Sequence, residues 1–187
     1  MAADSPTDAV LARHLYRLAL AHKDITGAEL TCEGFKQVIM GISGKLPYPT
    51  NYAFWTAIVT CYARPFIDNK GVGVLPKAWR SFSDGRLQRA HNLIMKARNE
   101  VYAHSDITIA KMFVIPAGAE MPGVGRRAPR PSWYFQSYEI PPDAIIDVHD
   151  CCTDLKQRLE KEVTQMTEAL CAKNGATAQF ELKWASP

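Results

Sequence analysis

The chain has 187 residues, of which 47% are apolar and 22% are charged, and this composition indicates one globular domain rather than a disordered chain. Its 22 basic and 19 acidic residues give a net charge of +3, too small to indicate a nucleic-acid partner unless the charges cluster. The five cysteines show no C-x-x-C spacing, so we expect buried thiols and neither a metal site nor a cofactor.

The N-terminal sequence has no basic segment followed by an apolar run, so no secretory signal is expected. No apolar stretch approaches the roughly 18 residues that a membrane helix needs. We therefore expect a cytoplasmic protein that makes no membrane contact.

The first half of the chain predicts helices. Apolar residues recur at helical spacing over residues 8–22, and a shorter helix is expected over 32–40 with Thr31 as its N-cap. A broad apolar face predicts a helix over 51–63. Pro65 should end it, because the residue before a proline is disfavoured in helical geometry.

A short helical turn is predicted from Pro76 to Trp79, followed by a long helix that Ser83 or Asp84 can cap and that ends near residues 103–104. The pattern then changes. Apolar residues first alternate with polar or small ones and then form a short unbroken run, and several are β-branched, so a strand is predicted over residues 107–115.

Residues 116–132 are rich in glycine and proline and are predicted to form a basic loop, while 133–140 can pair with 107–115 as a hairpin. The longest helix is expected over 143–173, and a last short strand over 179–184. Together these elements predict a mostly α fold: one domain over 1–187, a bundle of four or five helices with a small β-hairpin insertion at about 107–140.

The stretch 96–106 gathers polar side chains near the predicted end of a helix. Arg98 is followed directly by the polar Asn99, and five residues separate Arg98 from His104. In this the chain resembles the HEPN family, whose helical bundles carry an Arg, four to six residues, His motif with a polar residue commonly after the Arg.

A second segment, Tyr-Ala-Arg-Pro-Phe at 62–66, adds to the resemblance. The order of these two helix ends is similar to that in small bacterial and phage HEPN-like proteins of the defence or toxin–antitoxin type. The resemblance covers about residues 50–106, with the helix expected over 143–173 as a further bundle partner.

The resemblance implies a metal-independent endoribonuclease in which the RNA 2′-hydroxyl attacks the neighbouring phosphate and leaves a 2′,3′-cyclic phosphate and a 5′-hydroxyl. His104 would transfer protons, since an unperturbed imidazole has a pKa of about 6.5. Arg98 would hold phosphate oxygens, and Asn99 would orient the phosphate or the histidine. The candidate substrate-binding residues are Arg64, Tyr102 and Ser105.

Geometry adds a condition. Six positions along a regular helix turn through about 600°, so Arg98 and His104 would point roughly 120° apart. The two side chains can converge within one chain if the helix unwinds before His104. They can also converge across a two-fold homodimer, which is the arrangement that the resemblance to HEPN proteins implies. We expect the homodimer.

Other interpretations stay open at this stage. Arg98 could be a cation favoured by the helix dipole, and His104 could cap the last carbonyls. Arg64 could line the same cleft, or pair with Asp68 or Glu100.

The remaining histidines, His14, His22, His91 and His149, are expected in ordinary core or surface positions. The loop arginines Arg126, Arg127 and Arg130 are expected to be solvated, although they could contact RNA or an acidic antitoxin.

The alternative function is a non-catalytic HEPN-like module that binds RNA, a nucleotide or a protein partner. A third interpretation is a structural subunit whose dimer buries apolar helix faces.

Overall fold

The computed structural model describes residues 6–42, 48–67, 73–99, 111–121, 125–136 and 140–174. Its helices are α1 (Pro6–Gly41), α2 (Tyr48–Ala63), α3 (Gly85–Ala97) and α4 (Ala144–Asn174), with 3₁₀ turns η1 (Arg64–Phe66) and η2 (Lys77–Arg80). The strands are β1 (Lys111–Ile115), β2 (Glu120–Met121), β3 (Arg126–Arg127) and β4 (Ser132–Gln136). The expectation of a mostly helical chain with a small β insertion is confirmed.

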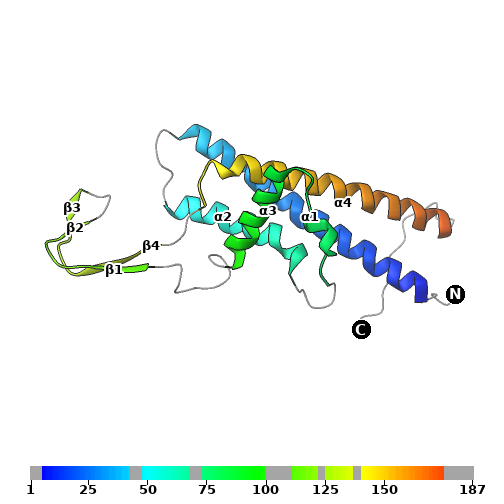
Figure 1. Ribbon diagram of the computed structural model, residues 1–187, viewed down its shortest axis with the longest axis horizontal. Coiled ribbons are helices and arrows are strands. Elements are labelled where there is room, and N and C mark those ends of the chain that lie inside the picture. The colour runs from blue at the N-terminus through cyan, green and yellow to red at the C-terminus, as the bar shows by residue number, and fades with distance from the viewer. Residues whose placement is uncertain are drawn as a thin grey trace.

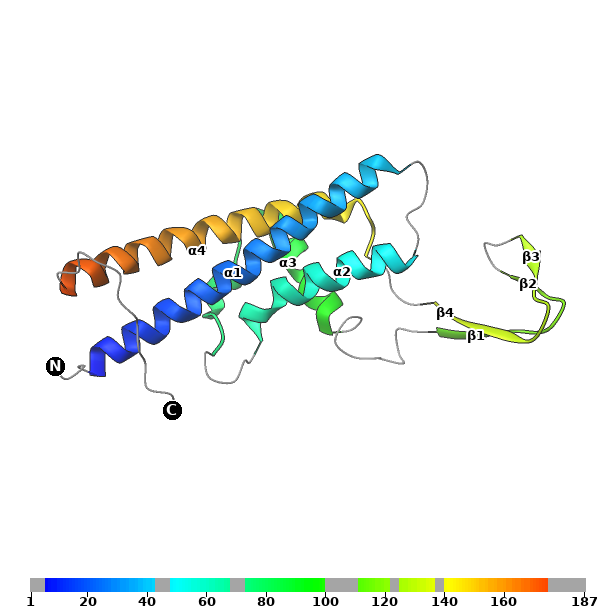
Figure 2. The same cartoon turned by 180° about the vertical axis from the view of Figure 1, so that it is seen from behind.

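The two long helices α1 and α4 lie side by side and run in opposite directions (Figures 1 and 2). Helix α2 packs against α1, also in the opposite direction, and the shorter α3 lies across α4 and α2 (Figure 1). No described helix combines the length and the apolar character that crossing a membrane requires.

The core forms where the apolar faces of the four helices meet, and its large side chains are fully buried. Phe35 of α1 stacks on Phe54 of α2 with ring centroids 4.9 Å apart and meets Trp55 edge-on at 5.5 Å. Cys151 and Cys152 of α4 are fully buried in the same core. The expectation of buried thiols is therefore confirmed for these two cysteines and for Cys32, whereas Cys61 and Cys171 are only partly buried.

Helix α1 corrects the sequence-based division of this region into two helices. It runs without a break for 36 residues and is longer than α4, which has 31, so the expectation that the last helix is the longest is also wrong. Thr31 is not an N-cap, because its hydroxyl donates to the Gly27 carbonyl at 2.7 Å inside the helix. The buried Ile25 and Ala28 hold this central part against the core, and that packing outweighs the weak helix propensity of Gly27.

Helix α2 ends at Ala63, directly before the 3₁₀ turn that contains Pro65, as predicted. The turn predicted after Pro76 is η2. Asp84 caps α3, since its carboxylate accepts a hydrogen bond from the Arg86 backbone N–H at 2.7 Å. The predicted helix end near 103–104 and the predicted strand over 179–184 lie outside the described residues.

The predicted hairpin is confirmed in its described part: β1 and β4 pair antiparallel, with Lys111 opposite Gln136 and Ile115 opposite Ser132. Residues 116–132 are more than a loop. Strands β2 and β3 pair within this segment, with Glu120 opposite Arg127.

Candidate functional site

The end of α3 carries the described part of the predicted motif. Regular α-helical geometry ends at Ala97, and residues 98–99 form a wider π-helical turn. Such turns are frequent at functional sites. The Arg98 N–H remains bonded to the carbonyls of Ile94 and Met95, and the buried Ile94 and Ala97 anchor this end of the helix in the core.

The side chains of Arg98 and Asn99 contact each other on this turn. Arg98 Nη1 donates to Asn99 Oδ1 at 3.0 Å. Asn99 is exposed, and Arg98 is half-buried. The carboxamide of Asn99 therefore holds one edge of the Arg98 guanidinium, a contact that was not predicted from the sequence. The angular relation between Arg98 and His104 lies outside the described residues, which end at Asn99 in this part of the chain.

Of the other predicted site residues, the structure describes only Arg64. Tyr102, His104 and Ser105 lie outside the described residues. Arg64 forms an ion pair with Asp24 of α1, with Nη1 3.4 Å from Oδ1, and its side chain is 51% exposed. Its two sequence-based acidic candidates, Asp68 and Glu100, also lie outside the described part of the chain.

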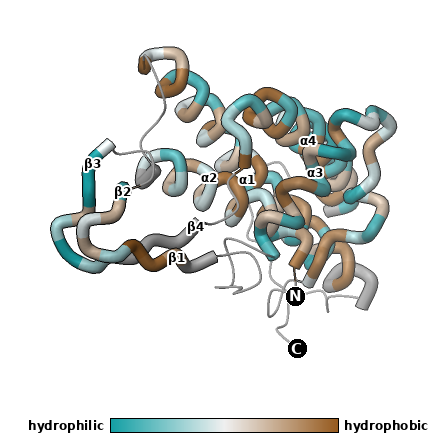
Figure 3. Tube along the Cα trace, turned by 60° about the vertical axis from the view of Figure 1, so that its left-hand side comes forward, coloured by the Kyte–Doolittle hydropathy of each residue, from teal (hydrophilic) through white to brown (hydrophobic). Residues whose placement is uncertain are grey.

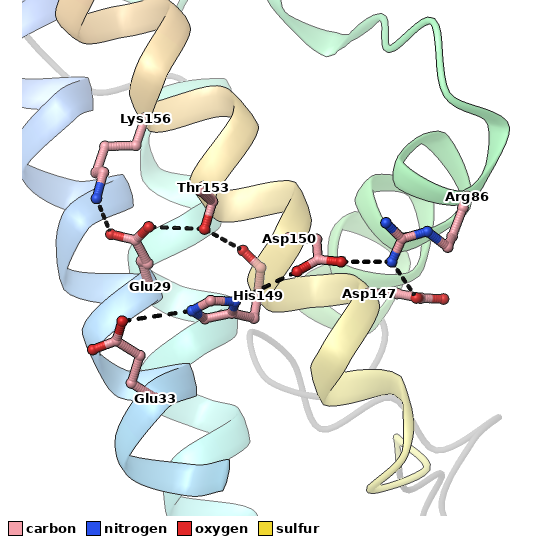
Figure 4. Close-up of polar contacts among 8 residues, drawn as sticks. All are labelled: Glu29, Glu33, Arg86, Asp147, His149, Asp150, Thr153 and Lys156. Atoms are coloured by element: carbon pink, nitrogen blue, oxygen red, sulfur yellow. Dashed lines mark hydrogen bonds and ion pairs between the residues drawn. The ribbon is translucent and has the colours of Figure 1, made fainter.

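A polar cluster, which sequence reasoning did not find, ties α1 to α4 (Figure 4). Glu29 is only 5% exposed, and its carboxylate accepts hydrogen bonds from Lys156 Nζ and, at 2.8 Å, from Thr153 Oγ1. Burial alone would raise the pKa of Glu29, but the hydrogen bonds from Lys156 and Thr153 outweigh it and lower this pKa. Glu29 is therefore a charged, paired carboxylate inside the bundle.

The cluster continues to His149, which lies between two carboxylates (Figure 4). Its Nε2 is 3.7 Å from Glu33 Oε1, and its Nδ1 is 3.6 Å from Asp150 Oδ1. Arg86 of α3 donates from Nη1 to Asp150 at 2.7 Å and to Asp147 at 2.8 Å. The hydrogen bond from Arg86 lowers the pKa of Asp150.

This cluster is suited to holding helices together. Its cations Arg86 and Lys156 are matched to carboxylates, and its ion pairs join α3 to α4 and α1 to α4. Among the described residues, no group of three His, Cys, Asp or Glu side chains is arranged to hold a metal ion.

A second buried polar group lies in the core. Tyr62 Oη is 2.9 Å from His91 Nδ1 and 3.1 Å from Cys151 Sγ. Burial, with a smaller effect of the nearby Arg80, lowers the pKa of His91 to about 4, so this imidazole is neutral at pH 7. His91 thus occupies an ordinary core position, as the sequence suggested.

This group also explains part of the 62–66 segment. Tyr62 and Phe66 are buried and pack against His91, with the Phe66 ring edge-on to the imidazole at 5.1 Å. These two aromatic residues are therefore core residues, and Arg64 is the exposed, charged member between them.

A pocket of about 280 Å³ lies between α3, α4 and the segment that joins η2 to α3. The Arg158 guanidinium on its wall is 5.2 Å from the centre of the Phe82 ring and donates to the Ser81 carbonyl at 3.3 Å. These contacts give Arg158 a structural role. The pocket is lined by Ser81, Phe82, Ser83, Leu87, Asp154 and Arg158.

No family model, no curated protein and no solved structure matches this chain. The HEPN family is therefore an expectation that rests on the motif residues of the sequence alone.

Proposed function

We propose that this chain is a metal-independent endoribonuclease of the HEPN type, which cleaves RNA by attack of a 2′-hydroxyl on the adjacent phosphate. The observation that carries the proposal is the Arg98–Asn99 pair, with its 3.0 Å hydrogen bond, on the π-helical turn at the end of α3. The sequence leads from this turn to His104, the proposed proton-transfer group.

In this mechanism Arg98 binds the non-bridging oxygens of the scissile phosphate and stabilises the charge that develops there. Asn99 is a positioning residue, because it holds the guanidinium before substrate arrives and so reduces the reorganisation needed in the transition state. His104 takes the proton of the 2′-hydroxyl or returns one to the 5′-oxygen that leaves.

Tyr102, Ser105 and Arg64 are assigned to substrate binding. Arg64 would do so from the half-exposed side chain that now pairs with Asp24. The complete site is proposed to form in a two-fold homodimer, in which two copies of the α3 end face one cleft that seats the RNA.

The test is cleavage of mixed RNA by purified protein in the presence of EDTA, with end-group analysis for a 2′,3′-cyclic phosphate. His104→Ala should lower the rate by about 10²–10⁴-fold, and Arg98→Ala by about 10²–10³-fold. Asn99→Ala should have a smaller effect, since Arg98 keeps its charge.

Matched controls exist on the bundle itself. Arg89→Ala removes an exposed arginine from the same helix, and His14→Ala removes a histidine from α1; both should cleave like the parent protein. Equal cleavage by the parent and by His104→Ala would reject the mechanism. Intact RNA in every sample, with RNA still bound, would indicate the non-catalytic HEPN-like module instead.

A further inference from the structure

The β insertion forms an arm that projects beyond the helical bundle (Figures 1 and 2). The two strand pairs belong to one ribbon, because backbone hydrogen bonds join them where they meet. The Gly118 N–H donates to the Ala128 carbonyl at 2.7 Å, and the Ala128 N–H donates to the Ala119 carbonyl at 2.8 Å. Isolated two-stranded ribbons are only marginally stable in water, so a partner that covered such an arm would add to its stability.

The net positive charge of the chain comes from this arm. Residues 111–136 contain four basic side chains and one acidic side chain, Glu120, which gives +3. The rest of the chain has 18 basic and 18 acidic residues, by subtraction from the totals of 22 and 19, and is neutral. Basic residues are therefore clustered on the arm, although the small net charge of the whole chain did not reveal it. The basic residues are Lys111, Arg126, Arg127 and Arg130.

The three arginines of the arm are exposed. None of them forms an ion pair with another residue that the structure describes. Arg126 and Arg127 are neighbours on one strand and so point to opposite faces of the ribbon. Figure 3 shows this strand as hydrophilic and, farther along the ribbon, a hydrophobic part of β1, the strand on which Phe113 and Val114 are exposed. The arm thus presents cations on both faces together with apolar surface.

We infer that this arm binds the phosphate backbone of RNA, independently of base sequence, and holds the strand for the site at the end of α3. The inference rests on the proposed function, because it takes RNA as the substrate. Arginine forks suit phosphate oxygens, and each neutralised phosphate releases counterions. In chain order the arm follows the Arg98–Asn99 pair, since β1 is the next described element after α3.

The test measures binding apart from cleavage. Every protein carries His104→Ala, and the probe is a fluorescein-labelled 30-nucleotide single-stranded RNA without stable secondary structure, titrated at several salt concentrations. The arm variant is Arg126→Gln/Arg127→Gln/Arg130→Gln. The control is Lys23→Gln/Lys77→Gln/Lys161→Gln, which removes the same charge from exposed positions on α1, η2 and α4.

The arm variant should bind at least tenfold more weakly near 0.1 M salt, and the slope of log K against log salt should fall by about 2. The control should stay within twofold of its parent. An arm variant that binds like the control would overturn the inference. Tighter binding of polyglutamate than of RNA would also overturn it and would indicate an acidic protein partner.

These outcomes are separable from the fate of the nuclease. RNA binding that depends on the arm, in a protein that never cleaves RNA, would retain the arm as a binding surface and reject the nuclease. Cleavage that depends on His104, with binding unaffected by the arm variant, would retain the nuclease and reject the arm as its RNA-binding surface. Circular dichroism melts of both triple variants show whether the bundle is intact.

Discussion

Acidification should destabilise this protein through one buried imidazole, His91. Its folded-state pKa is about 4, whereas an unperturbed histidine has a pKa of about 6.5. As the pH falls below about 6.5, the unfolded chain binds a proton that the folded chain refuses, so the free energy of unfolding decreases. The stability that the protein gains from keeping His91 neutral is fully present above about pH 6.5 and is lost progressively as the pH falls to about 4.

The difference between a pKa of about 6.5 in the unfolded chain and about 4 in the folded protein corresponds to about 3 kcal/mol of stability, of which about 2 kcal/mol is lost between pH 7 and pH 5. The change in stability just below pH 7 reports on histidine, because most carboxyl groups begin to titrate only near pH 5. The cause is structural: His91 is 4% exposed and is surrounded by aromatic rings.

The assay is urea denaturation at pH 7, 6 and 5, followed by circular dichroism. His91→Gln retains a group that can accept the Tyr62 hydrogen bond but cannot titrate, so its stability should change by about 2 kcal/mol less over this range. His14→Gln controls for the loss of a histidine and should behave like the parent. Parallel pH profiles of the parent and His91→Gln would refute this account of the core.

Two further substitutions test the contacts that hold the helices, each by urea denaturation at pH 7. Asp84→Ala should lower the free energy of unfolding by about 1 kcal/mol, because the Arg86 N–H loses its cap; Asp84→Asn should restore most of it, and an equal loss in both variants would argue against capping. Lys156→Met should cost about 2 kcal/mol or more, because it leaves the buried Glu29 carboxylate without its cation. The Glu29→Met/Lys156→Met double variant should recover much of that loss, and strictly additive losses would show that the two side chains do not act as a pair.

The parts of the fold that could be predicted from the sequence are those with strong periodicity or local chemistry. The apolar face of α2, the proline that follows it and the Asp84 cap all act within a few residues, so the pattern reveals them. The division of α1 failed because Thr31 is compatible with both a cap and a helix interior. Burial against α2 and α4 decided between them, and that burial is not visible locally.

In the candidate site, too, contacts between residues far apart in the chain could not be predicted from the sequence. Arg98 and Asn99 were singled out by the sequence motif, but the hydrogen bond between their side chains was not predicted. The partner of Arg64 is Asp24, forty positions earlier in the chain, and only the packing of α1 on α2 brings them together. Likewise Lys156 and Glu29 are 127 positions apart and meet because α1 and α4 run in opposite directions.

The buried cysteines provide an intrinsic reporter of helix separation. Cys32 of α1 and Cys152 of α4 are fully buried, and the hydrogen bond between them, together with burial, raises the pKa of the Cys152 thiol well above its usual range. Both thiols are therefore protected from alkylating reagents while α1 and α4 stay together. Their labelling rate in native buffer would measure how often this pair of helices opens, without any engineered probe.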